Sequence, residues 1–271
     1  MLSDISQKRL FLLDLDGTLY LDETLFDGTL PFLSRVREIG GRALFLTNNS
    51  SRGVEAYLEK MARLGIEATA NDFLTSTDAT VRYIKENHPG TLFYVAGTKS
   101  FRGQLTSAGI PVTTDRNDPK IGGVLLGFDT ELTFSKLEDV CILLRRDIPY
   151  LATNPDLVCP TWYGSVPDCG SVSKMICNAT GKMPRFIGKP EPDMILLALE
   201  KTGYGKADAL MIGDRVYTDI AAGVHAGIDT VLVLSGEGTV ADAEKSDEKP
   251  TWILPDISFV TRQLSDRKSV V

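Results

Sequence analysis

The residues with the clearest chemical potential lie directly after the first apolar run of the chain. Asp14 and Asp16 follow the run Leu10–Leu13, which predicts a buried strand, and Gly17 begins a turn. Because the two carboxylates are two residues apart, both can face the opening where the strand ends. In an open α/β sheet, ligands bind at this carboxyl edge. One carboxylate could attack an electrophile while the other transfers a proton, and together they suit Mg²⁺.

The same residues also have a purely structural interpretation. Asp-Gly is a common turn dipeptide, and Asp and Thr residues often cap helices. Taken alone, the stretch 14–19 therefore leaves turn formation and catalysis both open.

Further polar residues occupy comparable places, either directly after an expected strand or at the start of an expected helix. Each alone is explained as a helix cap, a turn residue or a solvated surface residue. In a doubly wound sheet, however, such positions converge on one edge. Carboxylates, a hydroxyl, an amide and an ammonium together suit phosphoryl transfer, in which a metal and a lysine neutralise the phosphate oxygens. The residues are Thr47, Asn48, Lys189, Asp214 and Asp219.

The elements that must position these residues alternate between buried strands and amphipathic helices. This pattern predicts an α/β fold with a doubly wound parallel sheet. The pattern restarts in the middle of the chain, which predicts a core of residues 1–78 and 183–271 and an inserted α/β domain at 79–182. Strands are expected at 10–13, 43–46, 92–96, 124–128, 150–153, 209–212, 230–234 and 252–254, and helices at 30–39, 54–64, 134–146, 171–179, 193–201 and 219–226.

The composition excludes several classes of protein. The 271 residues carry a net charge of −7 and no basic run, which argues against nucleic-acid binding. No apolar stretch is long enough to span a bilayer and no signal peptide is visible, so a cytoplasmic protein with no membrane partner is expected. The four cysteines form no Cys-x-x-Cys pair and there are two histidines, which argues for free thiols rather than a zinc site.

Four motifs, in order, resemble those of phosphatases of the haloacid dehalogenase superfamily. Residues 14–20 (DLDGTLY) resemble the first motif, 46–50 (LTNNS) the second, 188–192 (GKPEP) the third and 213–220 (GDRVYTDI) the fourth. The likeness covers nearly the whole chain and is to the NagD-like or 4-nitrophenylphosphatase-like subfamily. It implies a Rossmann-like core with an inserted α/β cap of the C2 type.

The resemblance implies a role for each matching position. Asp14 would be the nucleophile that forms an aspartyl-phosphate, and Asp16 would protonate the leaving oxygen and then activate water. One Mg²⁺ would be held by Asp14, the backbone carbonyl of Asp16 and Asp214. Asp219 would orient Lys189 or the water ligands of the metal. The residues implied to bind the phosphoryl oxygens are Thr47, Asn48, Asn49 and Lys189.

The expected function is therefore Mg²⁺-dependent hydrolysis of small phosphorylated metabolites, with 4-nitrophenyl phosphate as an artificial substrate. An acid at the Asp16 position favours phosphate esters, because a dehalogenase has no alkoxide to protonate. A phosphotransferase using the same intermediate and a non-catalytic ligand-binding regulator remain alternatives. Caps of this type can mediate dimers in relatives, which leaves a homodimer open.

Substrate selection is expected in the cap, and the segment 163–170 is a candidate specificity loop. Its proposed members are Pro167, Asp168 and Cys169, and Gly and Pro residues would allow a close approach to the site. Relatives tend to carry a small residue where this chain has Asp168. A carboxylate facing the site would disfavour acidic substrates such as phosphoglycolate, which predicts a neutral sugar or polyol phosphate. A plain surface turn is the alternative.

Overall fold

The structure is a computed structural model that describes residues 4–161 and 163–265. The chain folds into two compact units. Among the described residues, the first unit comprises 4–47, 57–74 and 189–265, and the second comprises 48–56 and 75–188. The second unit therefore extends beyond the expected limits of 79 and 182. It also includes a short excursion of the chain, residues 48–56, that the sequence pattern does not indicate.

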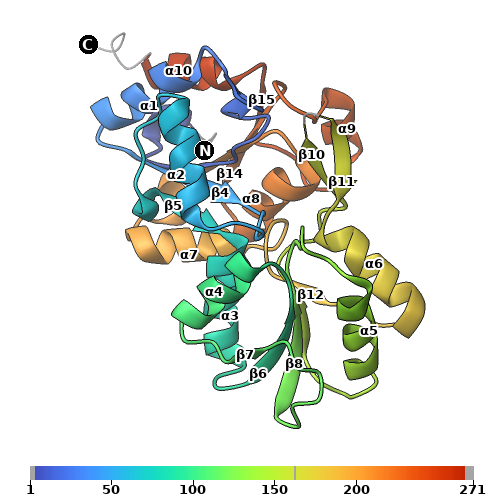
Figure 1. The fold of residues 1–271 in the computed structure, drawn as a ribbon. Coiled ribbons are helices and arrows are strands. Elements are labelled where there is room, and N and C mark those ends of the chain that lie inside the picture. The colour runs from blue at the N-terminus through green and yellow to red at the C-terminus, as the bar shows by residue number, and fades with distance from the viewer. Residues whose placement is uncertain (1–3, 162, 266–271) are drawn as a thin grey trace. The chain divides into compact units, whose positions relative to one another are not determined.

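The first unit is built on a six-stranded sheet (Figure 1). In spatial order its strands are β15 (Trp252–Leu254), β14 (Asp229–Val233), β13 (Ala209–Gly213), β1 (Leu10–Leu13), β4 (Arg42–Thr47) and β5 (Phe73–Thr75). All pairings from β15 to β4 are parallel. The chain moves outward from β1 through β4 to β5, then restarts beside β1 and moves outward through β13, β14 and β15. This order is doubly wound, and the change of direction lies between β1 and β13, where such sheets bind ligands.

Sequence pattern explains why these elements form. All four residues of β1 are fully buried, as expected for a parallel strand covered on both faces. Helix α1 (Thr29–Glu38) buries Phe32, Leu33 and Val36, which share one face of the helix. The other helices that belong wholly or mainly to this unit are α2 (Val54–Arg63), α7 (Asp193–Thr202), α8 (Ala221–Ala226), α9 (Val240–Lys245) and α10 (Ile257–Ser265).

Short elements complete the first unit. They are the hairpin strands β2 (Tyr20–Leu21) and β3 (Thr24–Leu25), the 3₁₀ turns η1 (Ile5–Gln7), η2 (Ala70–Asp72) and η3 (Lys206–Asp208), and the π-helical turn η4 (Val216–Ile220). The expected helix at 219–226 therefore begins earlier, as a π-helical turn, a feature often found at functional sites.

The second unit contains a five-stranded, fully parallel sheet. In spatial order its strands are β12 (Arg185–Phe186), β9 (Tyr150–Ala152), β8 (Ile121–Leu126), β6 (Leu92–Ala96) and β7 (Val112–Thr113). Figure 1 shows helices α3 (Ser76–Asn87) and α4 (Lys99–Ser107) on one side of this sheet and α5 (Phe134–Leu143) and α6 (Cys169–Thr180) on the other. A hairpin of β10 (Val158–Thr161) and β11 (Gly164–Pro167) precedes α6.

Side chains that alternate along β6 supply both apolar layers of the second unit. Phe93 and Val95 pack with residues of α3 and α4, whereas Tyr94 and Ala96 pack with residues of α5 and α6. Strand β8 begins at Ile121, before the expected run 124–128, and therefore includes Gly123. A Cβ atom on Gly123 would lie 2.4 Å from the Phe93 ring, so only glycine leaves room for that ring.

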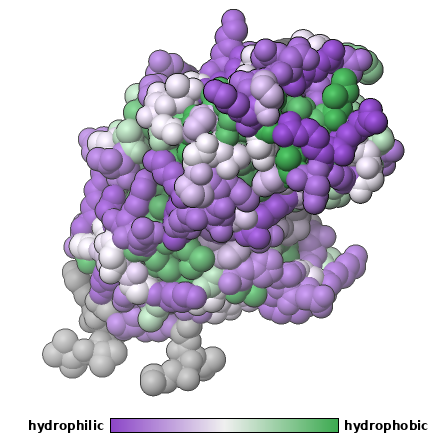
Figure 2. Space-filling model, turned by 90° about the horizontal axis from the view of Figure 1, so that it is seen from below, coloured by the Kyte–Doolittle hydropathy of each residue, from purple (hydrophilic) through white to green (hydrophobic). Residues whose placement is uncertain are grey.

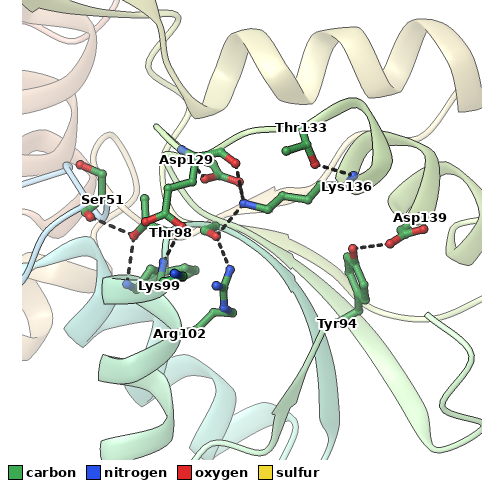
Figure 3. A network of polar contacts seen from close by, with 12 residues as sticks. Ser51, Tyr94, Thr98, Lys99, Arg102, Asp129, Thr133, Lys136 and Asp139 are labelled. Carbon is green, nitrogen blue, oxygen red and sulfur yellow. Dashed lines mark hydrogen bonds and ion pairs between the residues drawn. The ribbon is translucent and has the colours of Figure 1, made fainter. Parts of the chain in front are cut away.

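Hydrogen bonds explain why residues 48–56 belong to the second unit. Thr98 Oγ1 donates to the carbonyl of Ser51 at 2.9 Å, and the Ser50 and Thr153 hydroxyls lie 2.9 Å apart. Figure 3 shows the bond to Ser51 near an ion pair between Lys136 Nζ and Asp129 Oδ2, 2.7 Å apart. The excursion is therefore tied to residues that follow β6 and β9 in the second sheet.

The described helices include none that is long and apolar enough to cross a membrane. On the face drawn in Figure 2, hydrophilic residues predominate and hydrophobic residues lie in separate groups among them.

Candidate active site

The first two carboxylates extend from the carboxyl end of β1. The amide of Asp14 continues the sheet by donating to the carbonyl of Ile212 at 2.9 Å. The chain then turns at Gly17, whose φ of +83° favours glycine. A Cβ atom there would also lie 2.4 Å from Asp214 Oδ2. The turn leaves the Asp14 side chain 17% exposed, whereas that of Asp16 is 56% exposed and can meet a substrate.

Lys189 connects two carboxylates that are far apart in the sequence. Its Nζ lies 2.5 Å from Asp14 Oδ1 and 2.6 Å from Asp219 Oδ1. The second oxygen of Asp219 accepts a hydrogen bond from the amide of Arg215 at 3.0 Å, within the turn that leads into η4. The Lys189 side chain is only 3% exposed, so its charge is directed at these carboxylates rather than at solvent.

A third carboxylate completes an acidic cluster that could hold a metal ion. Asp14, Asp214 and Asp219 each offer an oxygen, and these oxygens lie within 4.8 Å of one another. Asp214 follows β13, and its Oδ2 accepts a hydrogen bond from the amide of Glu237 at 2.8 Å. Its Oδ1 is buried and has no hydrogen-bond partner among the described residues. A buried carboxylate oxygen without a donor is suited to a cation.

The surroundings of the cluster raise the pKa values of two of its carboxyl groups and of its lysine. Burial, followed by repulsion from Asp219, raises the pKa of Asp14 well above its usual range, although Lys189 opposes this. Burial and Asp219 also raise the pKa of Asp214 to about 6. Burial alone would lower the pKa of the Lys189 ammonium, but Asp14 and Asp219 outweigh it and raise that pKa. The cluster therefore holds more carboxylate charge than one lysine balances.

Asp16 and Thr47 lie at the same edge of the sheet as Asp14. Strands β1 and β4 are parallel, with Leu13 opposite Phe45, so the residues that follow both strands emerge on one side. The Thr47 hydroxyl is buried and lies 3.3 Å from the hydroxyl of Tyr57 on α2. Burial raises the pKa of Asp16, and Lys60 opposes that shift.

Asn48 and Asn49, which are expected to bind phosphate, belong to the second unit. Asn48 Nδ2 donates to Asp156 Oδ2 at 2.8 Å, and its carbonyl accepts from the Ser76 hydroxyl at 2.7 Å. Asn49 Oδ1 accepts from the amide of Ser51 at 2.9 Å. These contacts hold the chain just after Thr47, and the role of the two amides toward phosphate stays a prediction.

The structure corrects the expectation that segment 163–170 is a loop. The segment forms strand β11 and the start of α6, because Asp168 caps that helix. Asp168 as a whole is only 5% exposed, and its carboxylate accepts from the amide of Cys169 at 2.5 Å and lies 3.4 Å from Asn154 Nδ2. Cys169 is fully buried, and Pro167 is exposed. Asp168 therefore serves as a helix cap rather than as an exposed charge, although a role for the hairpin in specificity stays a prediction.

Sequence patterns did not single out Tyr57, Lys60 or Arg215. Arg215 Nε donates to Glu237 Oε2 at 2.8 Å beside the carboxylate cluster, and Lys60 Nζ lies 3.5 Å from Asp16 Oδ1. Tyr57 and Lys60 are three residues apart on α2 and hence on one helix face. A polar pair with this spacing in an amphipathic helix is the signal that could have identified them.

Two family models match the chain, one in its N-terminal part and one in its C-terminal part. A model for haloacid dehalogenase-like hydrolases matches residues 11–111, and a HAD-hydrolase-like model matches residues 186–259. An acid sugar phosphatase of Staphylococcus aureus is 34% identical over 260 residues, which cover 96% of this chain and 99% of that protein.

Solved structures show the same relationship. A 4-nitrophenylphosphatase of Thermotoga maritima has a TM-score of 0.89 at 36% identity, and the match covers 96% of this chain and 98% of that one. A glycerol phosphate phosphatase of Mycobacterium tuberculosis, in complex with magnesium, has a TM-score of 0.88 at 29% identity, covering 97% of this chain and 78% of that one.

This chain belongs to the haloacid dehalogenase-like hydrolases. Within that family it is a hydrolase of phosphoric monoesters, as its motifs predict.

Proposed function

We propose that the protein is a divalent-cation-dependent phosphatase of sugar and polyol phosphates that acts through an aspartyl-phosphate on Asp14. The observation that carries this proposal is the position of the Asp14 carboxylate at the end of β1, held 2.5 Å from Lys189 Nζ and clustered with Asp214, whose Oδ1 has no hydrogen-bond partner in the part of the chain that the structure describes. A nucleophile, a fixed cation and a carboxylate oxygen that can bind a metal ion are what phosphoryl transfer requires.

Asp14 and Asp16, which follow β1, have different roles in the reaction. Asp14 attacks phosphorus, and the bond to the leaving oxygen breaks while Asp16 gives that oxygen a proton. The ionised Asp16 then takes a proton from water, whose oxygen attacks the phosphorus of the aspartyl-phosphate and releases Asp14. Because the surroundings of Asp16 raise its pKa, the acid form needed for the first step is more populated than for an ordinary aspartate.

The donor set fits a hard divalent cation, for which we propose Mg²⁺. Asp14, the backbone carbonyl of Asp16 and Asp214 would hold it, because both oxygens of Asp219 already accept hydrogen bonds. When bound, the ion supplies positive charge that stabilises the phosphoryl oxygens. Asp219 instead positions the Lys189 ammonium next to the Asp14 carboxylate.

The phosphoryl oxygens would be bound by Lys189 and the Thr47 hydroxyl, with Asn48 and Asn49 as further donors. Tyr57 lies against Thr47 and can fix the direction of that hydroxyl. The sugar and polyol class is supported by relatives named acid sugar phosphatase and glycerol phosphate phosphatase. Asp168 gives no support to this substrate class, because it is buried and caps helix α6.

A panel of phosphate esters tests the proposal. The purified protein should hydrolyse 4-nitrophenyl phosphate with added Mg²⁺ and lose that activity in EDTA. Among natural esters, glycerol phosphate and hexose phosphates should exceed phosphoglycolate in kcat/KM. Release of inorganic phosphate in the presence of glycerol as a competing acceptor separates hydrolysis from phosphoryl transfer. A clear preference for phosphoglycolate would contradict the substrate class.

The metal-free protein should lose stability as the pH rises from about 4 to about 6. The folded state raises the pKa of Asp214 to about 6, above its value in the unfolded chain, and therefore binds a proton more tightly in this range. We expect the Tm in EDTA to fall by roughly 5 °C across this range. Mg²⁺ should raise the Tm more at about pH 7.5 than at about pH 4.5, because it competes with protons for the carboxylates. An equal Mg²⁺ effect at both pH values would contradict this assignment.

A further inference from the structure

Lys60 is a cation beside Asp16 that neither the motifs nor the proposed reaction steps use. Its Nζ lies 3.5 Å from Asp16 Oδ1, and among the described residues it is the one side chain that hydrogen-bonds this carboxylate. The Asp16 side chain is 56% exposed, so little else restricts its orientation. A general acid needs a fixed direction toward the oxygen that it protonates.

Lys60 is itself held in place by an aromatic ring. Its Nζ lies 3.9 Å from the centroid of the Tyr20 ring, and Tyr20 is fully buried. The backbone of Asp16 forms a bridge to that of Tyr20, and Tyr20 accepts a hydrogen bond from the amide of Gly17 at 2.8 Å. The Tyr20 ring that contacts the Lys60 ammonium thus belongs to the same turn as the Asp16 carboxylate. A cation over the face of an aromatic ring is attracted to that ring.

A second cation on the same helix provides a useful contrast. Arg63 pairs with Glu23, but both side chains are more than half exposed, at 57% and 64%. Exposed pairs of this kind contribute little. The Lys60 side chain is 20% exposed and reaches a residue of the site, so its placement is not that of an ordinary surface lysine.

We propose that Lys60 is a positioning residue that holds the Asp16 carboxyl group in the direction needed to protonate the leaving oxygen. The inference rests on the proposed function and deepens it. Its consequence is a dependence on the leaving group. An alkoxide must be protonated as it departs, whereas 4-nitrophenolate departs readily without that help. Loss of Lys60 should therefore matter more for alkyl phosphates.

The test compares two esters in three single variants. Lys60→Met keeps the aliphatic length of the side chain, Lys60→Arg restores a cation, and Arg63→Met is the control that removes a cation from the same helix. We compare kcat/KM, which reports the step in which the leaving group departs, because hydrolysis of the aspartyl-phosphate is common to both esters. We expect Lys60→Met to lower kcat/KM about 10-fold or more for glycerol phosphate and less than about 3-fold for 4-nitrophenyl phosphate. Lys60→Arg should recover much of the loss, because a guanidinium also stacks on aromatic rings. Arg63→Met should leave both rates within about 2-fold.

A double variant shows whether Lys60 acts through Asp16. In the Asp16→Asn background, Lys60→Met should cause no further loss with glycerol phosphate, because the group that it positions is gone. Additive losses, or equal losses in kcat/KM for both esters, would each overturn the proposal and assign Lys60 to folding or to substrate binding. If the wild-type protein turns over neither ester, the proposed function itself fails, and this inference with it.

Discussion

Replacing Asp14 by asparagine should abolish phosphatase activity, with a loss in kcat of at least about four orders of magnitude. The amide keeps the shape of the carboxylate but is no nucleophile. The fold should persist, because Lys189 retains Asp219 as a partner at 2.6 Å. Removing one of three clustered acids also lessens repulsion, so the Tm of the metal-free variant should equal or exceed that of the wild type.

The measurement is turnover of 4-nitrophenyl phosphate together with the Tm of each protein. Asp27→Asn is the matched control, because it makes the same change at an exposed aspartate and should leave turnover intact. Rapid quenching of the wild type during turnover should trap one phosphoryl group on the peptide that contains Asp14, and Asp14→Asn should trap none. Substantial turnover by Asp14→Asn would refute the nucleophile assignment.

Replacing Lys189 by methionine should lower both activity and stability. The Lys189 side chain is 3% exposed and is bonded to Asp14 and Asp219, so its removal leaves the partly buried Asp14 and the buried Asp219 carboxylates without their cation. Breaking a buried pair in this way costs about 3–5 kcal/mol of unfolding free energy. We expect kcat to fall by about three orders of magnitude, because a charge that neutralises the phosphoryl oxygens is lost.

The control for Lys189 is Lys136→Met in the second unit. Lys136 also forms a largely buried ion pair, with Asp129 at 2.7 Å, but it touches none of the catalytic positions. Its loss should lower the Tm while 4-nitrophenyl phosphate turnover stays within about 3-fold. Urea denaturation and initial rates measure the two effects separately. Near-normal turnover by Lys189→Met would contradict its assignment to phosphate binding.

Much of the fold follows from local patterns in the sequence. The strands β1, β6 and β13 and the helices α1 and α7 lie within a residue or two of their expected positions, because buried runs and helical spacing are properties of a short window. Helices α3 and α4 were not expected. Their starts do carry signals, since Thr75 and Thr98 cap them through side-chain hydrogen bonds, but polar residues outnumber apolar ones in both helices.

The second unit departs further from expectation because its stabilising interactions join residues that are distant in sequence. The excursion at 48–56 is held by Thr98 and Thr153, and no local pattern indicates partners so far away. Asp168 illustrates the same limit. Its residue type suits both a charged site and a helix cap, and only the burial of the carboxylate at the start of α6 separates the two.

The types of the residues that follow each buried strand can be read directly from the chain, and they predict a phosphoryl-transfer site and its family. How these residues pair depends on the fold. The fold joins Lys189 to Asp14 and Asp219, leaves Asp214 Oδ1 without a donor among the described residues and places Lys60 beside Asp16. Strand and turn signals act over a few neighbouring residues, whereas pairing depends on how the sheet brings distant strand ends to one edge.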